Sequence, residues 1–216
     1  MPHWIATLLF PPKCIFCKKL LAKEETDLCH DCRTETTAFK KINKSFSFIA
    51  GWTAVWYYNG NVRKSILRYK FSNARSYSVF YGKMIAMRLM EEEIEFDILS
   101  WVPTGSIRRF RRGYDHAELL AIAVGNELNL TPEKTLHKIR QTPPQSRLND
   151  PAHRRANVLG AYCAITPEKI RGKRVLLIDD VVTTGSTVNE CARTLLTAGA
   201  KEIYLAAIAA TSQNKK

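Results

Sequence analysis

The 216-residue chain lacks several features that would place it in large, well-known protein classes. Its apolar runs fall short of the roughly 18 to 20 residues that a membrane-spanning helix needs. It contains neither the G-x-x-x-x-G-K-[ST] loop that cradles a nucleoside triphosphate nor the G-x-G-x-x-G turn of dinucleotide-binding folds. Internal repeats and low-complexity tracts are also missing. We therefore expect a soluble globular protein without a membrane-spanning segment.

Acidic residues are scarce relative to basic ones. The chain has 20 Asp and Glu against 33 Lys and Arg, and its formal net charge is +13. An excess of this size favours polyanionic partners such as nucleic acid or phosphorylated ligands. The composition leaves a second interpretation open, in which the charge serves solubility and a single phosphate site.

The N-terminal stretch "WIATLLFPP" lacks the marks of an export signal. It has no basic start, its apolar run is short, and no small-residue cleavage site follows. We therefore expect a cytoplasmic protein, located free or peripherally at the inner face of the membrane. In a reducing compartment, grouped cysteines hold metal more often than they form disulfides.

Four cysteines form two C-x-x-C pairs in "CIFCKKLLAKEETDLCHDC", at Cys14, Cys17, Cys29 and Cys32. Two such turns supply the tetrahedral sulfur set that Zn²⁺ prefers in a closed structural site. A redox dithiol normally uses one C-x-x-C beside a βαβ unit, which does not fit this short polar segment. His30 is an alternative ligand inside the second pair. We expect a zinc-binding cysteine module over residues 1–42, and the basic connector "FKKINKS" joins it to a second domain over residues 43–216.

The rest of the chain alternates strand and helix patterns. Apolar or alternating runs predict strands at "GWTAVWYY", "DILSWVP", "KTLHKI", "RVLLIDD" and "EIYLAAIAA", and helical spacing predicts helices at "NVRKSILRYKF", residues 77–88, "YDHAELLAIAVGNEL" and "STVNECARTLLTAGA". In the first strand, Trp52, Ala54, Trp56 and Tyr58 are expected on one buried face. This order indicates an α/β fold with a doubly wound parallel sheet, whose ligands bind at the carboxyl ends of the strands.

Chemistry concentrates in "VLLIDDVVTTGST". Asp179 and Asp180 are expected to close a buried strand, and the loop after them opens a helix. Free backbone N–H groups and the dipole at a helix start favour a phosphate, and a glycine lets the backbone approach closely. Two carboxylates suit neighbouring hydroxyls or a hydrated Mg²⁺, and we expect neutral amides at both positions to leave the fold intact. The competing interpretation is a buried acidic pair beside a helix cap.

This stretch resembles the phosphoribosyl pyrophosphate (PRPP) signature of the type I phosphoribosyltransferases. The four-cysteine start, "VPTGSIRRFRRGYDHAELLA", "RQTPPQSRLNDPAHRRANVLGAY" and the PRPP signature also follow the order seen in the ComF family of competence proteins. The resemblance implies a type I phosphoribosyltransferase-like parallel sheet flanked by helices, with a zinc-binding module before it. It also implies that Mg²⁺ accompanies PRPP. In that reading Asp179 and Asp180 face the ribose hydroxyls, and the other PRPP and phosphate contacts come from Val182, Thr183, Thr184, Gly185, Ser186, Thr187, Pro103, Thr104 and Gly105.

Two arginine-rich segments accompany these motifs. By similarity, the first lies at the pyrophosphate loop and the second matches the flexible loop that closes over PRPP. Planar guanidinium groups bind phosphate oxygens in pairs, and a pyrophosphate loop this long and basic points beyond a small-molecule role. We expect DNA contacts from Arg108, Arg109, Arg111, Arg112, Arg140, Arg147, Arg154 and Arg155, although a solvated charge run is the alternative for the second segment.

Two functions fit these features. The ComF resemblance implies a competence protein that binds single-stranded DNA and handles its uptake or transport during natural transformation, where a helicase or a membrane DNA channel would be its protein partners. The alternative is a phosphoribosyltransferase that moves the phosphoribosyl group of PRPP to an acceptor the sequence does not identify. The sequence identifies no catalytic residue for either function.

Overall fold

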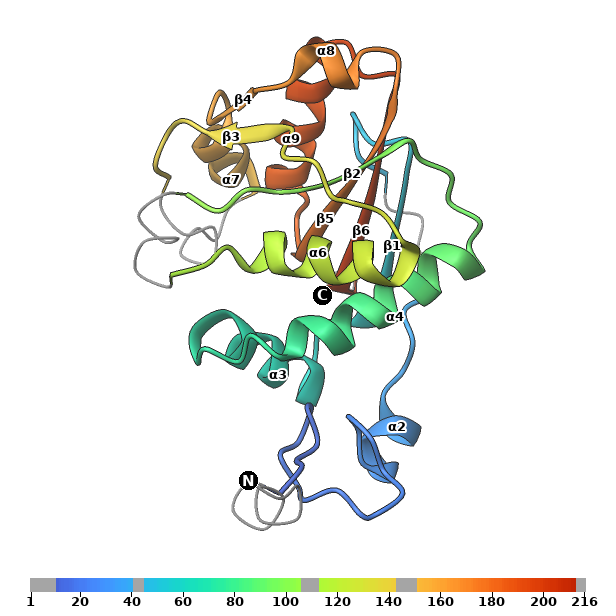
Figure 1. Cartoon of the computed structure of the whole chain (residues 1–216). Coiled ribbons are helices and arrows are strands. Elements are labelled where there is room, and N and C mark those ends of the chain that lie inside the picture. The colour runs from blue at the N-terminus through green and yellow to red at the C-terminus, as the bar shows by residue number, and fades with distance from the viewer. Residues whose placement is uncertain (1–10, 41–44, 106–112, 143–150, 213–216) are drawn as a thin grey trace.

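The computed structural model describes residues 11–40, 45–105, 113–142 and 151–212. Over these residues the chain is an α/β fold in which a parallel sheet is flanked by helices, and the cysteine module projects from one end (Figure 1). Within the described ranges, each helix is too short or too polar to cross a membrane.

The main sheet has four strands in the order β1-β6-β5-β2, and every neighbouring pair is parallel. The strands are β1 (Gly51–Tyr57), β6 (Glu202–Ala210), β5 (Arg174–Val182) and β2 (Ile98–Trp101). The two central strands carry the longest apolar runs, as strands covered on both faces require. In β5 the four residues from Val175 to Ile178 are fully buried, which confirms the predicted buried strand.

Helices cover both faces of this sheet. On one face, α3 (Gly60–Phe71), α4 (Tyr77–Glu91) and α6 (His116–Leu128) share an apolar cluster with Leu176 and Ile178 of β5. On the other face, α9 (Ser186–Thr197) and the short α8 (Pro167–Ile170) pack with Val175 and Leu177. Alternate residues of β5 therefore enter two separate cores, and this burial holds the end of β5 in a fixed place.

A second, smaller sheet departs from the sequence prediction. "KTLHKI" does form a strand, β3 (Leu136–Lys138), but β3 pairs antiparallel with β4 (Tyr162–Ala164) and stays outside the main sheet. The connection between these strands, which we expected to be a loop, contains α7 (Pro151–Val158). Both strands have three residues, too few to extend along the main sheet.

The predicted alternation in β1 is wrong beyond its first half. Trp52 and Ala54 enter the cluster beneath α9, whereas Trp56 enters the cluster beneath α4, and Tyr58 follows the strand. The shift occurs beside Val55, whose carbonyl accepts a hydrogen bond from the Phe39 N–H at 2.8 Å. The segment that follows the cysteine module thus pairs with the outer edge of β1 at this point.

The cysteine module docks on the helices of the main fold. It contains α2 (His30–Glu35), and the Phe16 ring contacts the rings of Trp56 and Phe80 with centroids 5.2 and 6.0 Å apart. From α3, Arg68 Nη2 donates to the carbonyls of Ile15 and Phe16, both at 2.7 Å. The module and the helical layer therefore share one apolar cluster. The domain boundary predicted near residue 42 lies outside the described residues.

Candidate functional site

The four predicted metal ligands converge in the cysteine module. The sulfur atoms of Cys14, Cys17, Cys29 and Cys32 all lie within 4.8 Å of one another. A tetrahedral Zn²⁺ with bonds of about 2.3 Å separates its sulfur ligands by about 3.8 Å. The Cys17 Sγ to Cys29 Sγ distance of 3.6 Å is close to that value. The donor set and its spacing fit one structural Zn²⁺.

Backbone N–H groups favour the thiolate form of Cys14, whereas burial and the neighbouring thiols raise the pKa of Cys32. Burial works against ionisation of Cys14, but N–H groups of Cys17, Cys29 and Phe16 donate to its sulfur and lower its pKa to about 7. Outside the module, Asn61 of α3 places its Nδ2 atom 3.9 Å from Cys32 Sγ. Such donors support a metal-bound sulfur and fix its orientation. The four-cysteine site therefore has the character of a structural zinc site, and it contacts α3.

The acid pair and the threonine loop lie at the carboxyl end of β5. The strand continues two residues past the pair and ends at Val182, so Asp179 and Asp180 lie inside the strand, not at its end. Residues 183–185 then form the loop, and α9 begins at Ser186. Gly185 precedes the helix with φ of 79°, a left-handed conformation that glycine adopts without strain.

This loop presents hydroxyl and amide donors at the start of a 12-residue helix. Thr184 Oγ1 and Ser186 Oγ lie 3.0 Å apart and share a hydrogen bond. Thr183 and Thr187 are half-buried, whereas Ser186 is buried. The first N–H groups of a helix have no partner within the helix, and its dipole places partial positive charge there. The loop is therefore suited to hold a phosphate group.

Asp180 is held by two basic side chains that the sequence prediction missed. Lys70 Nζ from the last turn of α3 lies 2.7 Å from Asp180 Oδ1, and His116 Nε2 from α6 lies 2.6 Å from Asp180 Oδ2. Burial alone would raise the pKa of Asp180, but the charges of Lys70 and His116 outweigh it and hold that pKa well below its usual range. Asp180 is thus an ionised structural anchor between three elements.

Asp179 has a different environment. Its side chain is half-buried, and its Oδ1 atom accepts a hydrogen bond from the Asp180 N–H at 2.8 Å. Burial and the neighbouring Asp180 carboxylate raise the pKa of Asp179. Since Asp180 is already occupied by two partners, Asp179 is the carboxylate of the pair with capacity left for a ligand hydroxyl or a hydrated Mg²⁺.

The predicted pyrophosphate loop lies beside this network. β2 ends at Trp101, and the buried Asp115 accepts hydrogen bonds from Thr104 N–H at 2.7 Å and Thr104 Oγ1 at 3.0 Å. Asp115 also caps α6 through the Ala117 N–H. Because His116 follows Asp115, one helix start holds both the loop after β2 and the acid pair of β5. Pro103 and Gly105 flank Thr104, and a Cβ atom on Gly105 would lie 2.7 Å from Gln141 Oε1.

For most of the predicted DNA-contacting arginines, the structure describes no side chain. Arg108, Arg109, Arg111, Arg112 and Arg147 fall outside the described residues, and only the backbone is described at Arg154 and Arg155. Arg140 is described. Its Nη2 atom donates to the carbonyls of Asn157 and Leu159 at the end of α7, at 3.3 and 2.6 Å. The DNA-binding role of these residues stays a prediction.

Of the site residues that the sequence prediction missed, some could have been predicted from the sequence and others could not. Asp115 precedes an apolar helical pattern and is a typical N-cap residue, so the start of α6 was readable. Lys70 gave no signal, because a lysine near the end of an amphipathic helix normally faces solvent. Its partnership with Asp180 joins residues 110 positions apart and depends on how α3 packs across the sheet.

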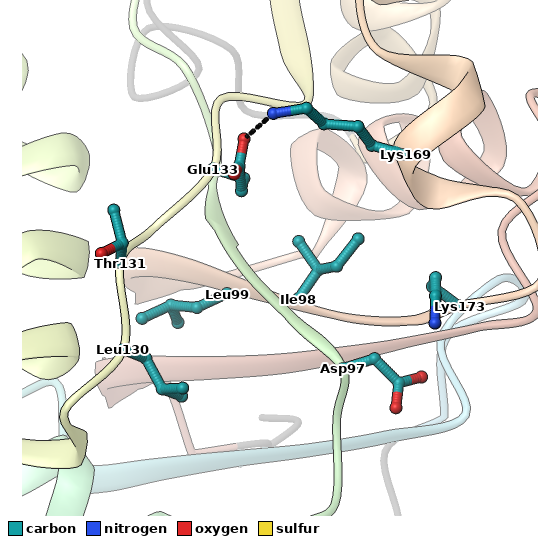
Figure 2. A pocket seen from close by; sticks show the side chains of 8 residues that line it. All are labelled: Asp97, Ile98, Leu99, Leu130, Thr131, Glu133, Lys169 and Lys173. Carbon is teal, nitrogen blue, oxygen red and sulfur yellow. Dashed lines mark hydrogen bonds and ion pairs between the residues drawn. The ribbon is translucent and has the colours of Figure 1, made fainter.

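A shallow pocket also lies at the opposite edge of the sheet (Figure 2). It is lined by Asp97, Ile98, Leu99, Leu130, Thr131, Glu133, Lys169 and Lys173. Asp97 precedes β2 and Lys173 precedes β5, so this pocket is near the amino ends of the strands. Lys169 forms an ion pair with Glu133 at 2.9 Å there. Sheets of this kind bind ligands at the carboxyl ends, which favours the acid-pair edge as the functional site.

Two family models match the chain. The phosphoribosyl transferase domain matches residues 134–216, a segment that contains the acid pair and the threonine loop. The double zinc ribbon domain matches residues 5–43, which contain all four clustered cysteines. These matches agree with the two sites described above.

Curated relatives are similar to about half of the chain. Competence protein F of Haemophilus influenzae is 35% identical over 48% of this chain and 46% of that protein. The DNA utilization protein YhgH of Salmonella typhi is 34% identical over 48% of this chain and 45% of that protein. A ribose-phosphate pyrophosphokinase of Gloeobacter violaceus is 27% identical over 59% of this chain and 31% of that protein.

Two solved structures align with the chain at lower similarity. The allosteric regulatory enzyme of purine biosynthesis aligns with 23% identity and a TM-score of 0.45, over 66% of this chain and 30% of that chain. Glutamine PRPP amidotransferase from B. subtilis, complexed with ADP and GMP, aligns with 24% identity, the same TM-score and the same coverage. The chain is thus similar to a phosphoribosyl transferase domain over residues 134–216 and to a double zinc ribbon domain over residues 5–43, and the competence protein F and YhgH relatives match about half of its length and about half of their own.

Proposed function

We propose that this protein handles single-stranded DNA during natural transformation, and that its phosphoribosyl transferase domain binds PRPP with Mg²⁺. The observation that carries the ligand assignment is the loop of residues 183–185, which lies between the acid pair of β5 and the start of α9. A phosphate donor set and a carboxylate that can accept from pentose hydroxyls stand next to each other at the ligand-binding edge of the sheet.

Each part of a phosphoribosyl ligand has a matching group. The 5′-phosphate would meet the amides and hydroxyls of residues 183–187, which donate hydrogen bonds and carry no negative charge. The pentose hydroxyls would meet Asp179, which only accepts hydrogen bonds when ionised. The loop held by Asp115 through Thr104 would face the pyrophosphate.

Mg²⁺ fits Asp179 better than Asp180. A hydrated Mg²⁺ binds through one or two carboxylates together with phosphate oxygens. Asp180 already has Lys70 and His116 against its two oxygens, so Asp179 is the protein ligand available to the ion. When bound, Mg²⁺ would neutralise the pyrophosphate charge. Lys70 and His116 hold the strand end in place without contacting the ion.

The DNA assignment has independent support. The curated relatives are named for competence and for DNA utilization. The chain has a net charge of +13, and counterion release from nucleic acid drives the binding of such proteins. We infer that Arg108, Arg109, Arg111 and Arg112, which belong to the predicted pyrophosphate loop, contact the DNA backbone. A DNA-handling protein of this kind would work with a helicase or a membrane DNA channel.

The second candidate function is transfer of the phosphoribosyl group of PRPP to an acceptor. The Asp115 hydrogen bonds favour it, since they hold the loop after β2 at the edge where the acid pair lies. Loss of pyrophosphate from PRPP needs cationic groups and Mg²⁺ around the departing charge. The acceptor and the catalytic residue stay unassigned. Release of pyrophosphate from PRPP in the presence of candidate acceptors would separate this function from binding alone.

One titration tests both parts of the proposal. Labelled single-stranded DNA is titrated with the protein, with and without PRPP and Mg²⁺, and PRPP binding is measured separately by calorimetry. We expect salt-dependent DNA binding, PRPP binding that needs Mg²⁺, and a change in DNA affinity when PRPP is present. DNA affinity that is equal at low and high salt would contradict the DNA function. No heat of PRPP binding would contradict the ligand assignment.

A matched pair of threonine variants locates the phosphate. Thr184→Val removes a loop hydroxyl, while Thr197→Val removes an exposed hydroxyl at the other end of α9. We expect Thr184→Val to weaken PRPP binding about tenfold, the size of one hydrogen bond to a charged group. Thr197→Val should leave the affinity unchanged. Equal affinities in the two variants would show that the phosphate binds elsewhere.

A further inference from the structure

Acidic residues are missing from one long part of the chain. Between Glu35 and Glu91 the sequence contains ten Lys and Arg and no Asp or Glu. This segment builds α3, the α3–α4 connection and most of α4. The segment therefore contributes only positive charges of its own to the surface, although Lys70 and Arg88 pair with the carboxylates of Asp180 and Glu92 from outside it.

Within this segment, α3 links the two sites described above. At its first turn, Asn61 Nδ2 approaches Cys32 Sγ of the cysteine cluster, and at its last turn Lys70 pairs with Asp180. Twelve residues of helix span about 18 Å. Figure 1 shows α3 between the cysteine module and the sheet. A ligand that follows α3 would thus run from the metal centre to the acid pair.

The outer side of α3 carries exposed cations. Arg63 and Lys64 are exposed, and within the described part of the chain neither forms an ion pair or a hydrogen bond through its side chain. Arg68, one turn later, is used to dock the cysteine module. Arg63 and Lys64 therefore stabilise no contact within the described fold, which leaves them available for an outside partner.

Two further cations are held on aromatic rings next to α3. Lys18 Nζ of the cysteine module lies 5.0 Å from the centre of the Tyr77 ring, and the Arg75 guanidinium lies 4.4 Å from the centre of the Tyr114 ring. Both cations are exposed, and both rings are buried. Stacking on a fixed ring reduces the freedom of a long side chain, so these charges are presented in defined positions.

An exposed aromatic ring completes the surface. Phe71 follows Lys70 at the end of α3 and is 66% exposed. The helix end beneath it is rigid, because Tyr69 Oη donates to the His116 carbonyl at 2.6 Å and Tyr114 Oη donates to the Tyr69 carbonyl at 3.2 Å. An exposed ring at a held helix end, with cations on the same helix, is suited to stack with unstacked bases. Duplex bases are already stacked and cannot use it.

We propose that Lys18, the exposed face of α3 and the α3–α4 connection form a binding surface for a single strand of nucleic acid. This inference rests on the proposed DNA function and assigns part of it to residues outside the predicted set of DNA-contacting arginines. Arg63, Lys64 and Lys18 contact backbone phosphates, and Phe71 stacks with a base. The strand passes along α3 between the metal centre and the acid pair.

The test compares two triple variants with equal loss of charge. Lys18→Gln, Arg63→Gln and Lys64→Gln change the proposed surface. Lys134→Gln, Lys173→Gln and Lys201→Gln change three exposed lysines outside it. The probe is a labelled deoxythymidine oligomer of about 20 nucleotides, longer than the roughly 4 to 16 nucleotides that one binding fold covers. Anisotropy is measured over a range of salt concentrations, and zinc content and PRPP affinity are checked in each variant.

We expect the surface variant to lower the slope of log affinity against log salt by about 2, since each lost phosphate contact on a single strand removes about 0.7. The control variant should keep the parent slope. Phe71→Ala should weaken binding about fivefold or more, the size of one lost base stack. Both changed variants should retain zinc and PRPP binding.

The outcomes separate the inference from the proposed function. If the parent does not bind the oligomer, the DNA function fails and this surface fails with it. If the parent binds and the two triple variants behave alike, the DNA function stands and this surface is wrong. If polyglutamate displaces the oligomer at equal charge concentration, the surface recognises negative charge in general, as an acidic protein partner would require, and the nucleic-acid assignment is overturned.

Discussion

Replacing Asp180 by Asn tests the division of roles within the acid pair. The substitution keeps the shape of the side chain but removes the charge that Lys70 and His116 face at 2.7 and 2.6 Å. The Asp180 side chain is 6% exposed, so water cannot replace the interaction that its charge makes with Lys70 and His116. Removing one member of a buried ion pair costs about 3 to 5 kcal/mol, because the remaining charge stays buried without a partner.

Partial exposure sets the expected value within that range. The Lys70 side chain is 21% exposed, so it can recover some hydration when Asp180 is neutral. We therefore expect a loss of about 3 kcal/mol in the free energy of unfolding. For a chain of this length the midpoint temperature falls by about 3 °C per kcal/mol, so the melting midpoint should fall by about 10 °C. The expectation from sequence, that amides are tolerated at both positions, predicts no such loss.

Asp179→Asn is the matched control. It makes the same chemical change one residue earlier, at a half-buried carboxyl without a cationic contact among the described ion pairs. We expect its stability to stay within about 0.5 kcal/mol of the parent or to rise, while PRPP affinity is lost. Urea unfolding in the presence of zinc and calorimetric PRPP titration measure both effects. Equal losses of stability in the two variants would refute the separation into an anchor and a ligand-facing carboxylate.

Three further predictions follow from the described contacts. Burial and Asp180 raise the pKa of Asp179, so the folded chain keeps a proton there that the unfolded chain has already lost. The free energy of unfolding should therefore fall as pH rises above about 4. This part of the fall should be missing in Asp179→Asn when urea midpoints are compared across pH. Cys32→Ser should reduce bound zinc from about one per chain to a small fraction, because three thiolates leave the tetrahedral shell open. Elemental analysis that finds zinc retained at the parent level would contradict the four-cysteine site. Gly185→Ala should cost about 1 to 3 kcal/mol, since φ is 79° and the added Cβ would clash with the Phe46 ring. The double variant with Phe46→Ala should recover part of that loss, and no recovery would show that backbone strain alone is responsible.

The sequence predicts best what is local. The apolar run of β5 and the donor-rich loop after it lie within one short segment, so composition and spacing alone locate the phosphate edge. The two C-x-x-C pairs are equally local, because thiolate chemistry and spacing determine the ligand set without reference to the rest of the fold. These features depend little on how distant elements pack.

Long-range packing accounts for what the sequence did not predict. The partners of Asp180 come from α3 and α6, and nothing in either helix pattern distinguishes Lys70 from a solvent-facing lysine. The pairing of β3 with β4 is likewise unreadable from two three-residue strands. In β1, Trp52 and Trp56 enter different clusters, and the edge of the strand pairs with Phe39, which belongs to the segment that leads from the cysteine module.

Docking of the cysteine module has a consequence for how the protein melts. Phe16 lies among rings of β1 and α4, and Arg68 ties α3 to the module backbone, so the metal-bound segment and the helical layer are interdependent. Chelation would therefore withdraw support from the layer that holds Lys70 against the strand end. Heat or denaturant should disassemble both parts in a single cooperative transition, and a chelator should lower the midpoint of that whole transition.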